Sequence, residues 1–351
     1  MAEGVRLAQE SKGLAEGTKY TLAAFVPSMM DAMTAEVSVG ATRKVDLLGR
    51  VVTLTEVTTT FQNPTGQMVA TSYVDETLNA LKTVMPMLGM SLEIIACDKS
   101  VALADNAMVD LLDKMLLDSP VPIDEKAAAI VYLLEPIGKQ ALAGFIATDS
   151  QAVQTTPGGA LQLTVRSVKP AAGVKFPYTG SDATALEALK PNRYIESDDE
   201  KVIALARQAV GDAGDAADAV KRIEKFVGEY ISEKSLSIGY ASAAEVVASR
   251  EGDCSEHAVL AAALCRAVGI PARVVAGYVY VPQLGQRSNV FGGHAWTEAM
   301  IDGRWIGLDA AQGSFGVGHI AQAVGNGEPS DFFRALSTMG NFKIANVTVE
   351  E

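Results

Sequence analysis

The chain has 351 residues, of which 48% are hydrophobic and 20% are charged. This length exceeds one typical domain, and the composition supplies a large hydrophobic core, which excludes a disordered chain and favours two globular domains. Acidic residues outnumber basic residues by 42 to 29, which gives a net charge of -13. Nucleic acid and anionic membrane surfaces are therefore unfavourable partners.

The three cysteines, Cys97, Cys254 and Cys265, are too few for a disulfide framework and fit either redox compartment. Cys97 ends the apolar run Leu92–Cys97 and is predicted to lie in the core of a strand. Cys254 and Cys265 belong to one predicted helix and lie about 16 Å apart at about 1.5 Å per residue, too far to bridge. No apolar stretch reaches the roughly 20 residues that span a bilayer. The first residues lack the basic and apolar regions of a signal peptide.

Residues 18–170 are rich in threonine and valine and predict short strands joined by tight turns. The strand candidates, in chain order, are Arg50–Phe61, Met68–Val74, Ala80–Met87, Lys126–Leu134 and Leu161–Val168. This order favours an antiparallel meander. One amphipathic helix is predicted between Asp105 and Asp118, because apolar residues recur there at helical spacing before a proline-rich stop.

Residues 170–197 contain scattered glycine and proline and are interpreted as a linker. Helical patterns follow at Asp198–Val210, Asp215–Lys234 and Ala241–Arg250. The sequence therefore predicts a β-rich domain with one helix and a linker over residues 1–195, and a second, α+β domain over residues 196–351.

The segment Cys254–Val268 is strongly helix-forming and apolar on most sides, so it predicts a buried helix that ends at Gly269. Asp253 or Cys254 is expected at its N-cap. A helix N-terminus carries about half a positive charge and unpaired N–H groups. Both favour the thiolate of Cys254, which is the reactive form of a cysteine. A lone cysteine is more often buried and inert, so the prediction depends on its context.

The dipeptide Asp302-Gly303 is a strong signal for a two-residue β-hairpin turn. In that register Trp296 faces Asp309, and His294, at the predicted start of its strand, lies diagonal to Asp309 within about 7–8 Å between backbones. A slip of one residue would send the pair to opposite faces. The residues predicted to share this face are His294, Trp296, Glu298, Trp305 and Asp309.

A thiol, an imidazole and a carboxylate are the three parts of a covalent acyl-transfer site. We predict that His294 accepts the proton of Cys254 and later protonates the leaving amine. Asp309 then fixes the tautomer of the ring and stabilises the imidazolium. Taken singly, each residue is more often structural, and the joint pattern is what favours catalysis.

Five motifs resemble the bacterial transglutaminase-like (papain-related) superfamily over residues 196–320. They are Gly252-Asp-Cys-Ser-Glu-His257, Arg266–Arg273, Gly277-Tyr278, Gly293–Glu298 and Trp305–Asp309. The resemblance implies a papain-like α+β core, with a nucleophile-bearing helix on an antiparallel sheet, and carries the catalytic triad onto Cys254, His294 and Asp309. It also implies a protein or peptide substrate. The first half is more loosely similar to β-rich regions that precede this domain in some exported bacterial members, which suggests an exported or periplasmic location.

Relatives with a metal use sequence features that this chain lacks. There is no EF-hand loop for calcium and no pair of CxxC motifs for zinc, so no cofactor or metal is predicted. Transglutaminases place an indole upstream of the nucleophile at the oxyanion, whereas both tryptophans here lie downstream. Tyr240 is the candidate replacement, and Trp296 and Tyr278 are candidates to line the substrate cleft, with core or edge packing as an equal alternative for Tyr278. The remaining polar residues are interpreted as non-catalytic: His257 packs on the helix surface, Arg273 anchors a strand, Glu298 is a solvated or structural carboxylate, and His319 lies in a loop.

Three functions remain open at this point. Attack by Cys254 gives a protease or amidase if water resolves the thioester, and a transglutaminase if an amine does. A second possibility is a non-catalytic module that binds a protein or glycan on the same scaffold. A third is a zinc hydrolase. The substrate, the acceptor and the oligomeric state are not given by the sequence.

Overall fold

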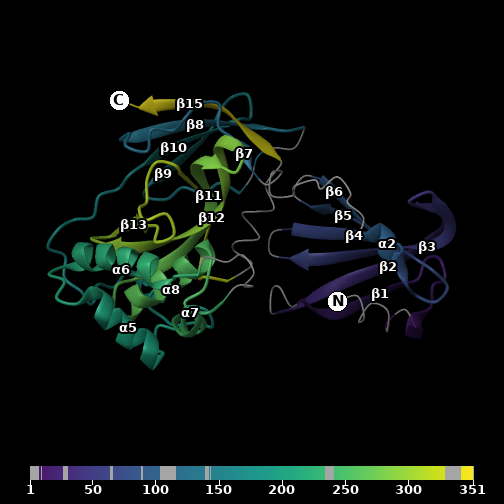
Figure 1. The fold of residues 1–351 in the computed structure, drawn as a ribbon, viewed down its shortest axis with the longest axis horizontal. Coiled ribbons are helices and arrows are strands. Elements are labelled where there is room, and N and C mark those ends of the chain that lie inside the picture. Colours follow the sequence, from purple (N-terminus) through teal and green to yellow (C-terminus); the bar gives the residue numbers. More distant parts are fainter. Residues whose placement is uncertain are drawn as a thin grey trace. The chain divides into compact units, whose positions relative to one another are not determined.

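The computed structural model describes residue 8 and residues 10–26, 31–63, 66–87, 90–102, 116–138, 142, 144–233, 241–328 and 341–350 (Figure 1). The chain divides into two compact units, Met1–Leu111 and Leu112–Glu351. The fold is mixed α+β with antiparallel sheets and a β-rich N-terminal region, as predicted.

The first unit is a six-stranded antiparallel meander, in which each strand pairs with the next one along the chain. Threonine and valine fit this pleated surface well. Between β2 and β3 the turn residues Leu48 and Gly49 both have positive φ, 57° and 91°, which matches the twist of the flanking strands. The strands are β1 (Lys19–Val26), β2 (Asp31–Leu47), β3 (Arg50–Asn63), β4 (Gly66–Val74), β5 (Ala80–Met87) and β6 (Met90–Ile95).

Two predictions in this region need correction. Strand β6 ends at Ile95, and the chain leaves the sheet toward the short helix α2 (Lys99–Ala102), so Cys97 is exposed rather than part of a strand core. The predicted helix Asp105–Asp118 falls mostly outside the described residues. Its last two residues form strand β7 (Leu117–Asp118) instead. An extended chain is expected there, because the following residue precedes a proline and is biased away from helical conformation.

The second unit contains two antiparallel sheets. The four-stranded sheet has the order β15-β8-β10-β9, so the C-terminal strand pairs with a strand from the first half of the chain. The five-stranded sheet has the order β13-β12-β11-β14, and β7 also pairs with β12. The strands are β8 (Ala129–Pro136), β9 (Gln151–Thr155), β10 (Leu161–Arg166), β11 (Ala272–Leu284), β12 (Arg287–Ile301), β13 (Arg304–Leu308), β14 (His319–Gly325) and β15 (Phe342–Glu350).

The division at Leu111/Leu112 differs from the domain boundary predicted at residues 195/196. Strands β8 and β10 belong to the same compact unit as the helices, because β15 pairs with β8 along most of its length. The hydroxyl of Tyr132 on β8 also donates to the carbonyl of Val317, in the chain that leads to the five-stranded sheet. A boundary drawn from composition cannot detect pairing between segments so far apart.

Helices α5, α6 and α7 pack around α8 (Figure 1). They lie close to the predicted ranges, except that α6 ends at Tyr230 rather than Lys234, and the short helix α4 lies in the predicted linker. Every residue of α8 from Ser255 to Arg266 is buried, as expected for a helix that is apolar on most sides. The other four helices described in this unit also begin with a side-chain N-cap, namely Asp182, Asp199, Asp215 and Ser242. The helices are α4 (Ala183–Glu187), α5 (Glu200–Val210), α6 (Ala216–Tyr230), α7 (Ala243–Ser249) and α8 (Cys254–Ala267).

Alternate residues of β12 face α8. Ala295, Ala299 and Ile301 belong to the core that α8 also enters, and Thr297 donates its hydroxyl hydrogen to the carbonyl of Ala258. The period of two in a strand therefore places His294 and Trp296 on the other face of the sheet. Among the described residues, no helix has the length and apolarity needed to cross a bilayer.

Candidate active site at the start of α8

Cys254 is the first residue of α8, and its side chain is half-buried. The N-cap is Asp253, whose carboxylate accepts the N–H of Ser255 at 2.8 Å. Glu256 completes a capping box by accepting the N–H of Asp253 at 2.9 Å. This confirms that the helix begins at the predicted cysteine, where its partial positive charge favours a thiolate.

Glu256 also fixes the chain that precedes α7. Its other oxygen accepts the N–H of Ala241 at 2.9 Å. Burial raises the pKa of Glu256 to about 6, and its hydrogen bond with Asp253 adds to the rise. Gly252 is needed at this point, because a Cβ there would lie 2.3 Å from the Cβ of Glu256. Cys254 thus follows a helix cap in which the residue before Asp253 has no room for a side chain.

The hairpin of β12 and β13 has the predicted register. Asp302 and Gly303 form the turn with φ of 52° and 73°, and Met300 pairs with Trp305. Thr297 pairs with Leu308, so Asp309 follows directly after β13, diagonal to His294. His294 lies well inside β12, which begins at Arg287, and not at the start of a strand as predicted. The register, rather than the position within the strand, brings the two side chains together.

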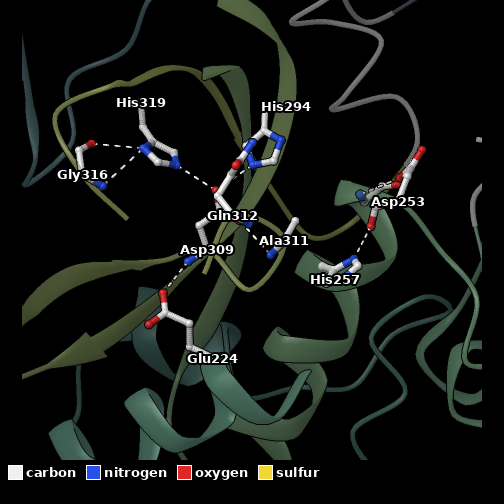
Figure 2. A network of polar contacts seen from close by, with 10 residues as sticks. Glu224, Asp253, His257, His294, Asp309, Ala311, Gln312, Gly316 and His319 are labelled. Atoms are coloured by element: carbon white, nitrogen blue, oxygen red, sulfur yellow. Dashed lines mark hydrogen bonds and ion pairs between the residues drawn. The ribbon is translucent and has the colours of Figure 1, made fainter. Parts of the chain in front are cut away.

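Asp309 is completely buried, and each of its carboxylate oxygens has two hydrogen-bond partners (Figure 2). Oδ1 accepts the N–H groups of Ala311 and Gln312 at 3.0 and 3.1 Å. Oδ2 lies 2.7 Å from Nε2 of His294 and 2.8 Å from Nε2 of His319. Burial alone would raise the pKa of Asp309, but the charge and hydrogen bond of His294 and the hydrogen bond of His319 hold that pKa well below its usual range. Asp309 is therefore an anion.

His294 is charged near neutral pH. Burial lowers its pKa, but the charge and hydrogen bond of Asp309, together with a hydrogen bond and the charge of Cys254, raise the pKa to about 10. Because Nε2 of His294 is engaged by Asp309, Nδ1 is the ring nitrogen left to face the thiol. The arrangement suits an imidazolium held between a carboxylate and a thiolate.

Helix α6 holds the backbone of Asp309 through the side chain of Glu224. The backbone N–H of Asp309 donates to Oε1 of Glu224 at 2.7 Å (Figure 2). Burial raises the pKa of Glu224, and the N–H of Asp309 opposes that rise. Gly228, one helical turn later, allows a close approach, since a Cβ there would lie 2.6 Å from the carbonyl oxygen of Ala310.

Gly228 gives a test of this support. An alanine in a helix normally adds about 1 kcal/mol of stability over glycine. We expect Gly228→Ala to lower the free energy of unfolding by about 1–3 kcal/mol instead, because the new methyl group displaces the chain next to Asp309. Urea denaturation measures this change. Gly214→Ala is the matched control, because a Cβ at Gly214 meets no atom within 4 Å. Equal effects of the two substitutions would contradict the proposed close packing.

His319 is the residue of this site that the sequence did not reveal. It was predicted in a loop, but it is the first residue of β14, it is 5% exposed, and it bonds to Asp309. Its ring packs against Phe315 and Trp296, with centroid distances of 4.5 and 5.3 Å. The chain has three histidines in all, and this scarcity is the one signal that could have drawn attention to it.

The other cleft candidates lie mainly in the core. Trp296 is 1% exposed and stacks at 6.3 Å beside the ring of His294, so it supports the imidazole. Tyr278 is fully buried and packs edge-on against Phe342, so it lines no open cleft in this structure and the prediction is corrected. It lies on β11, which has a neighbouring strand on each side. Tyr240, the candidate oxyanion donor, lies outside the described residues.

The remaining polar residues have structural contacts. Arg273 donates twice to Oε2 of Glu298, at 2.7 and 2.8 Å, and its guanidinium lies 3.9 Å from the ring centroid of Trp305. His257 is buried, and its Nδ1 lies 2.6 Å from the carbonyl oxygen of Asp253. It was predicted on the helix surface, but α8 is buried on that side too.

Three groups in the site have the chemistry of metal ligands. One ligand atom each from His294, Asp309 and His319 lies within 4.8 Å of the others. Imidazole nitrogen and carboxylate oxygen are common zinc ligands. The same atoms already bond to one another, so a metal would have to replace the two N–H protons that point at Asp309.

Comparison with known proteins assigns a family to part of the chain. Residues 203–310 match the family model of the transglutaminase-like superfamily. No curated protein sequence matches the chain. Among solved structures, a candidate cysteine protease from Cytophaga hutchinsonii is similar at 20% identity, with a TM-score of 0.40 over 67% of this chain and 86% of that one. The periplasmic domain of TgpA from Pseudomonas aeruginosa is similar at 16% identity, with a TM-score of 0.36 over 57% and 75%.

Both superpositions are weak, so the assignment rests on the family match. That match begins in α5 and ends one residue after Asp309, so it includes Cys254 and His294 but not His319. The C-terminal part of this chain therefore contains a domain of the transglutaminase-like superfamily.

Proposed function

We propose that this protein transfers acyl groups from amide or peptide carbonyls through a thioester on Cys254. The observation that carries the proposal is the link between a half-buried thiol at the start of α8 and an imidazole that Asp309 keeps charged. A thiol beside a charged imidazole is the pair that nucleophilic attack by sulfur on a carbonyl requires.

The proposed reaction has two halves. The sulfur of Cys254 attacks the carbonyl carbon, the C–S bond forms, and the carbonyl becomes an oxyanion. His294 then gives its proton to the leaving nitrogen, the C–N bond breaks, and the amine departs. In the second half His294 takes a proton from water or from an acceptor amine, which attacks the thioester and releases Cys254. Water gives hydrolysis and an amine gives transamidation, and the triad serves both.

The start of α8 offers a donor for the oxyanion. N–H groups in the first turn of a helix have no acceptor within the helix. Asp253 already occupies the N–H of Ser255, so we assign the N–H of Cys254 itself to the oxyanion. Removing a donor of this kind typically costs about 100- to 1,000-fold in rate.

Thiol labelling tests the proposal without a known substrate. At pH 6.5 we expect iodoacetamide to modify Cys254 at least about tenfold faster than Cys97, because ordinary thiols ionise mainly above about pH 8. Cys97 is the internal control, since it is more exposed than Cys254. Cys265 should react last, because burial raises its pKa to about 12. Mass spectrometry of the digested protein gives the three rates.

Slow labelling of Cys254, at or below the rate of Cys97, would instead favour the non-catalytic binding module.

The metal-ligand geometry of His294, Asp309 and His319 supports the zinc hydrolase as a second candidate. Elemental analysis separates the two enzymes, since a zinc hydrolase carries about one metal ion per chain after purification and loses activity with a chelator.

A further inference from the structure

Strands β2 and β3 extend beyond their neighbours in the N-terminal sheet. Strand β1 pairs with β2 as far as Ser38, and β4 pairs with β3 from Thr55 onward. Among the described strands, the segment Arg43–Leu54 therefore pairs only with itself, and we call it the hairpin arm. The side chains that hold the arm against the sheet are Val45, Leu47 and Leu54, which pack with Tyr73, Leu81 and Ile95. The arm is thus anchored, and its tip has a fixed place on the surface of this unit.

The tip of the hairpin arm exposes two large apolar side chains. Leu48 is 62% exposed and Val51 is 63% exposed. Leu48 also has a φ of 57°, a left-handed conformation that is unfavourable for leucine and that asparagine and glycine adopt readily. Leu78 has a similar φ of 67°, but its side chain packs against the core of the sheet. Packing within the unit explains Leu78 and does not explain Leu48, so the side chain of Leu48 is available for a contact outside the unit.

Basic side chains accompany the apolar tip. The hairpin arm contains Arg43, Lys44 and Arg50 and a single acidic residue, Asp46. The carboxylate of Asp46 accepts a backbone N–H of the turn at 2.7 Å, and Arg43 pairs with Glu56 at 3.1 Å. Lys44 and Arg50 are exposed, and neither forms an ion pair with another described residue. Two cations and two apolar side chains are therefore available on the same arm.

We propose that the tip of the hairpin arm binds the surface of a lipid bilayer that contains anionic headgroups. Leu48 and Val51 enter the boundary between headgroups and acyl chains, and Lys44 and Arg50 contact the headgroup phosphates. A specific protein interface buries roughly 800 Å² on each partner, which two side chains at a narrow tip cannot supply. A bilayer needs no matching shape, so it suits a small protruding tip better than a protein partner does.

The net charge of -13 disfavours an anionic bilayer, but that charge is spread over the whole chain. Exposed charges are screened over about 8 Å at physiological ionic strength. The charge that acts at the bilayer is therefore the local one, and on the hairpin arm it is positive. Each cation next to an anionic surface strengthens binding by about fivefold. Apolar insertion and local charge together give weak, reversible binding.

Vesicle binding by the full chain tests the proposal. The vesicles contain either phosphatidylcholine alone or equal parts of phosphatidylcholine and phosphatidylglycerol, and cosedimentation measures the bound fraction. We expect the wild type to bind the mixed vesicles at least about tenfold more tightly than the neutral ones, because two cations act at the anionic surface. Added salt should weaken this binding.

Leu48→Asn removes the apolar side chain and suits the backbone. We expect it to weaken binding to the mixed vesicles by at least about fivefold. The midpoint of urea unfolding should stay the same or rise, because asparagine tolerates the left-handed conformation. The matched control is Leu284→Asn, the same replacement at a leucine that is 47% exposed in the other compact unit. It should bind vesicles as the wild type does.

Two further variants separate charge and catalysis from apolar insertion. Arg50→Gln should weaken binding to the mixed vesicles about fivefold and leave binding to neutral vesicles unchanged. Cys254→Ala should bind as the wild type does, because lipid binding needs no thiol. A failure of the acyl-transfer proposal therefore appears in thiol labelling and kinetics, while a failure of this inference appears in vesicle binding.

Val51→Trp gives a second measurement by placing a fluorescent reporter at the tip. The native tryptophans, Trp296 and Trp305, are 1% and 7% exposed and supply a constant background. On mixed vesicles we expect the emission of the variant to shift to the blue and to be quenched by brominated acyl chains, because an indole at the tip lies at the interface.

Three results overturn the proposal. The first is a wild type that binds neither kind of vesicle, and the second is vesicle binding that Leu48→Asn leaves unchanged. The third comes from light scattering on the same samples: self-association of the wild type that Leu48→Asn abolishes, without vesicle binding, would assign the tip to a second copy of this chain.

Discussion

Replacing Cys254 with alanine should lower kcat for amide turnover by roughly 10⁴- to 10⁶-fold. The sulfur forms the covalent bond in both halves of the proposed reaction, and no other thiol can take its place. Cys265 is fully buried in the core, and it lies near the opposite end of α8. The residual rate would come from substrate binding and the oxyanion donor alone.

Measuring kcat requires a substrate, which can be identified by incubating the protein with peptide libraries. Wild-type protein is incubated with peptide libraries, and mass spectrometry identifies peptides whose acyl group accumulates on Cys254. Single-turnover kinetics with such a peptide then compare the wild type, Cys254→Ala and the control Cys97→Ser. Cys97 is exposed and lies in the other compact unit, so its loss should leave kcat unchanged within about twofold.

The result also separates the enzyme from its rivals. A binding module predicts no adduct in either protein and unchanged affinity for its ligand in Cys254→Ala. A zinc hydrolase built on His294, Asp309 and His319 predicts that Cys254→Ala keeps most of its activity. Retained turnover in Cys254→Ala, with the protein folded, would therefore end the thioester mechanism.

The placement of Cys254, His294 and Asp309 could be predicted because local signals determine it. The Asp302-Gly303 turn fixes the register of β12 and β13, and a period of two then puts His294 and Asp309 on one face. The start of α8 was predicted from the N-cap candidates Asp253 and Cys254, and the structure adds the capping box with Glu256. Each of these signals extends over only a few residues of chain.

His319 could not be predicted, because its contact with Asp309 depends on the order of strands. Asp309 follows β13 at one end of the order β13-β12-β11-β14, and His319 opens β14 at the other. The loop between them folds back across the sheet and brings Nε2 of His319 to 2.8 Å from Oδ2 of Asp309. Sequence periodicity predicts strands and their faces, but it does not give the order of strands in a sheet.

The same limit explains the other differences. Tyr278 is buried because Phe342, on a strand far along the chain, packs against its ring, and the sequence does not show this contact. The domain boundary was judged from composition, whereas the pairing of β15 with β8 joins the C-terminus to residues before 195. Both differences arise from contacts between segments far apart in the sequence.

Asp309→Asn should be nearly as damaging to turnover as loss of the nucleophile, with kcat reduced by about 10⁴-fold. Asparagine keeps the shape of aspartate but offers one acceptor oxygen and one donor NH₂ group. The structure places donors at both positions, with two backbone N–H groups at Oδ1 and two imidazoles at Oδ2. In either orientation the NH₂ group of asparagine therefore faces N–H groups that also need an acceptor. His294 in addition loses the anion that keeps it charged.

Stability should fall in a manner that depends on pH. The pKa of Asp309 is lowered on folding, so its contribution is present above the unfolded value of about 3.9 and is lost as the pH falls further. The pKa of His294 is raised from 6.5 to about 10, so its contribution is complete below 6.5 and is lost as the pH rises through about 10. The difference in unfolding free energy between wild type and Asp309→Asn should thus be largest between about pH 4 and 6.5 and shrink on both sides.

Urea denaturation across pH 3–10 measures this difference, and Asp302→Asn is the matched control. Asp302 is exposed in the hairpin turn with a φ of 52°, which asparagine adopts readily, so the control should match the wild type in activity and stability. A destabilisation by Asp309→Asn that stays constant over this range would show that the carboxylate contributes by packing and not by its charge. Since the charge of Asp309 is what holds His294 as an imidazolium, that outcome would remove the basis for a thiolate–imidazolium pair at this site.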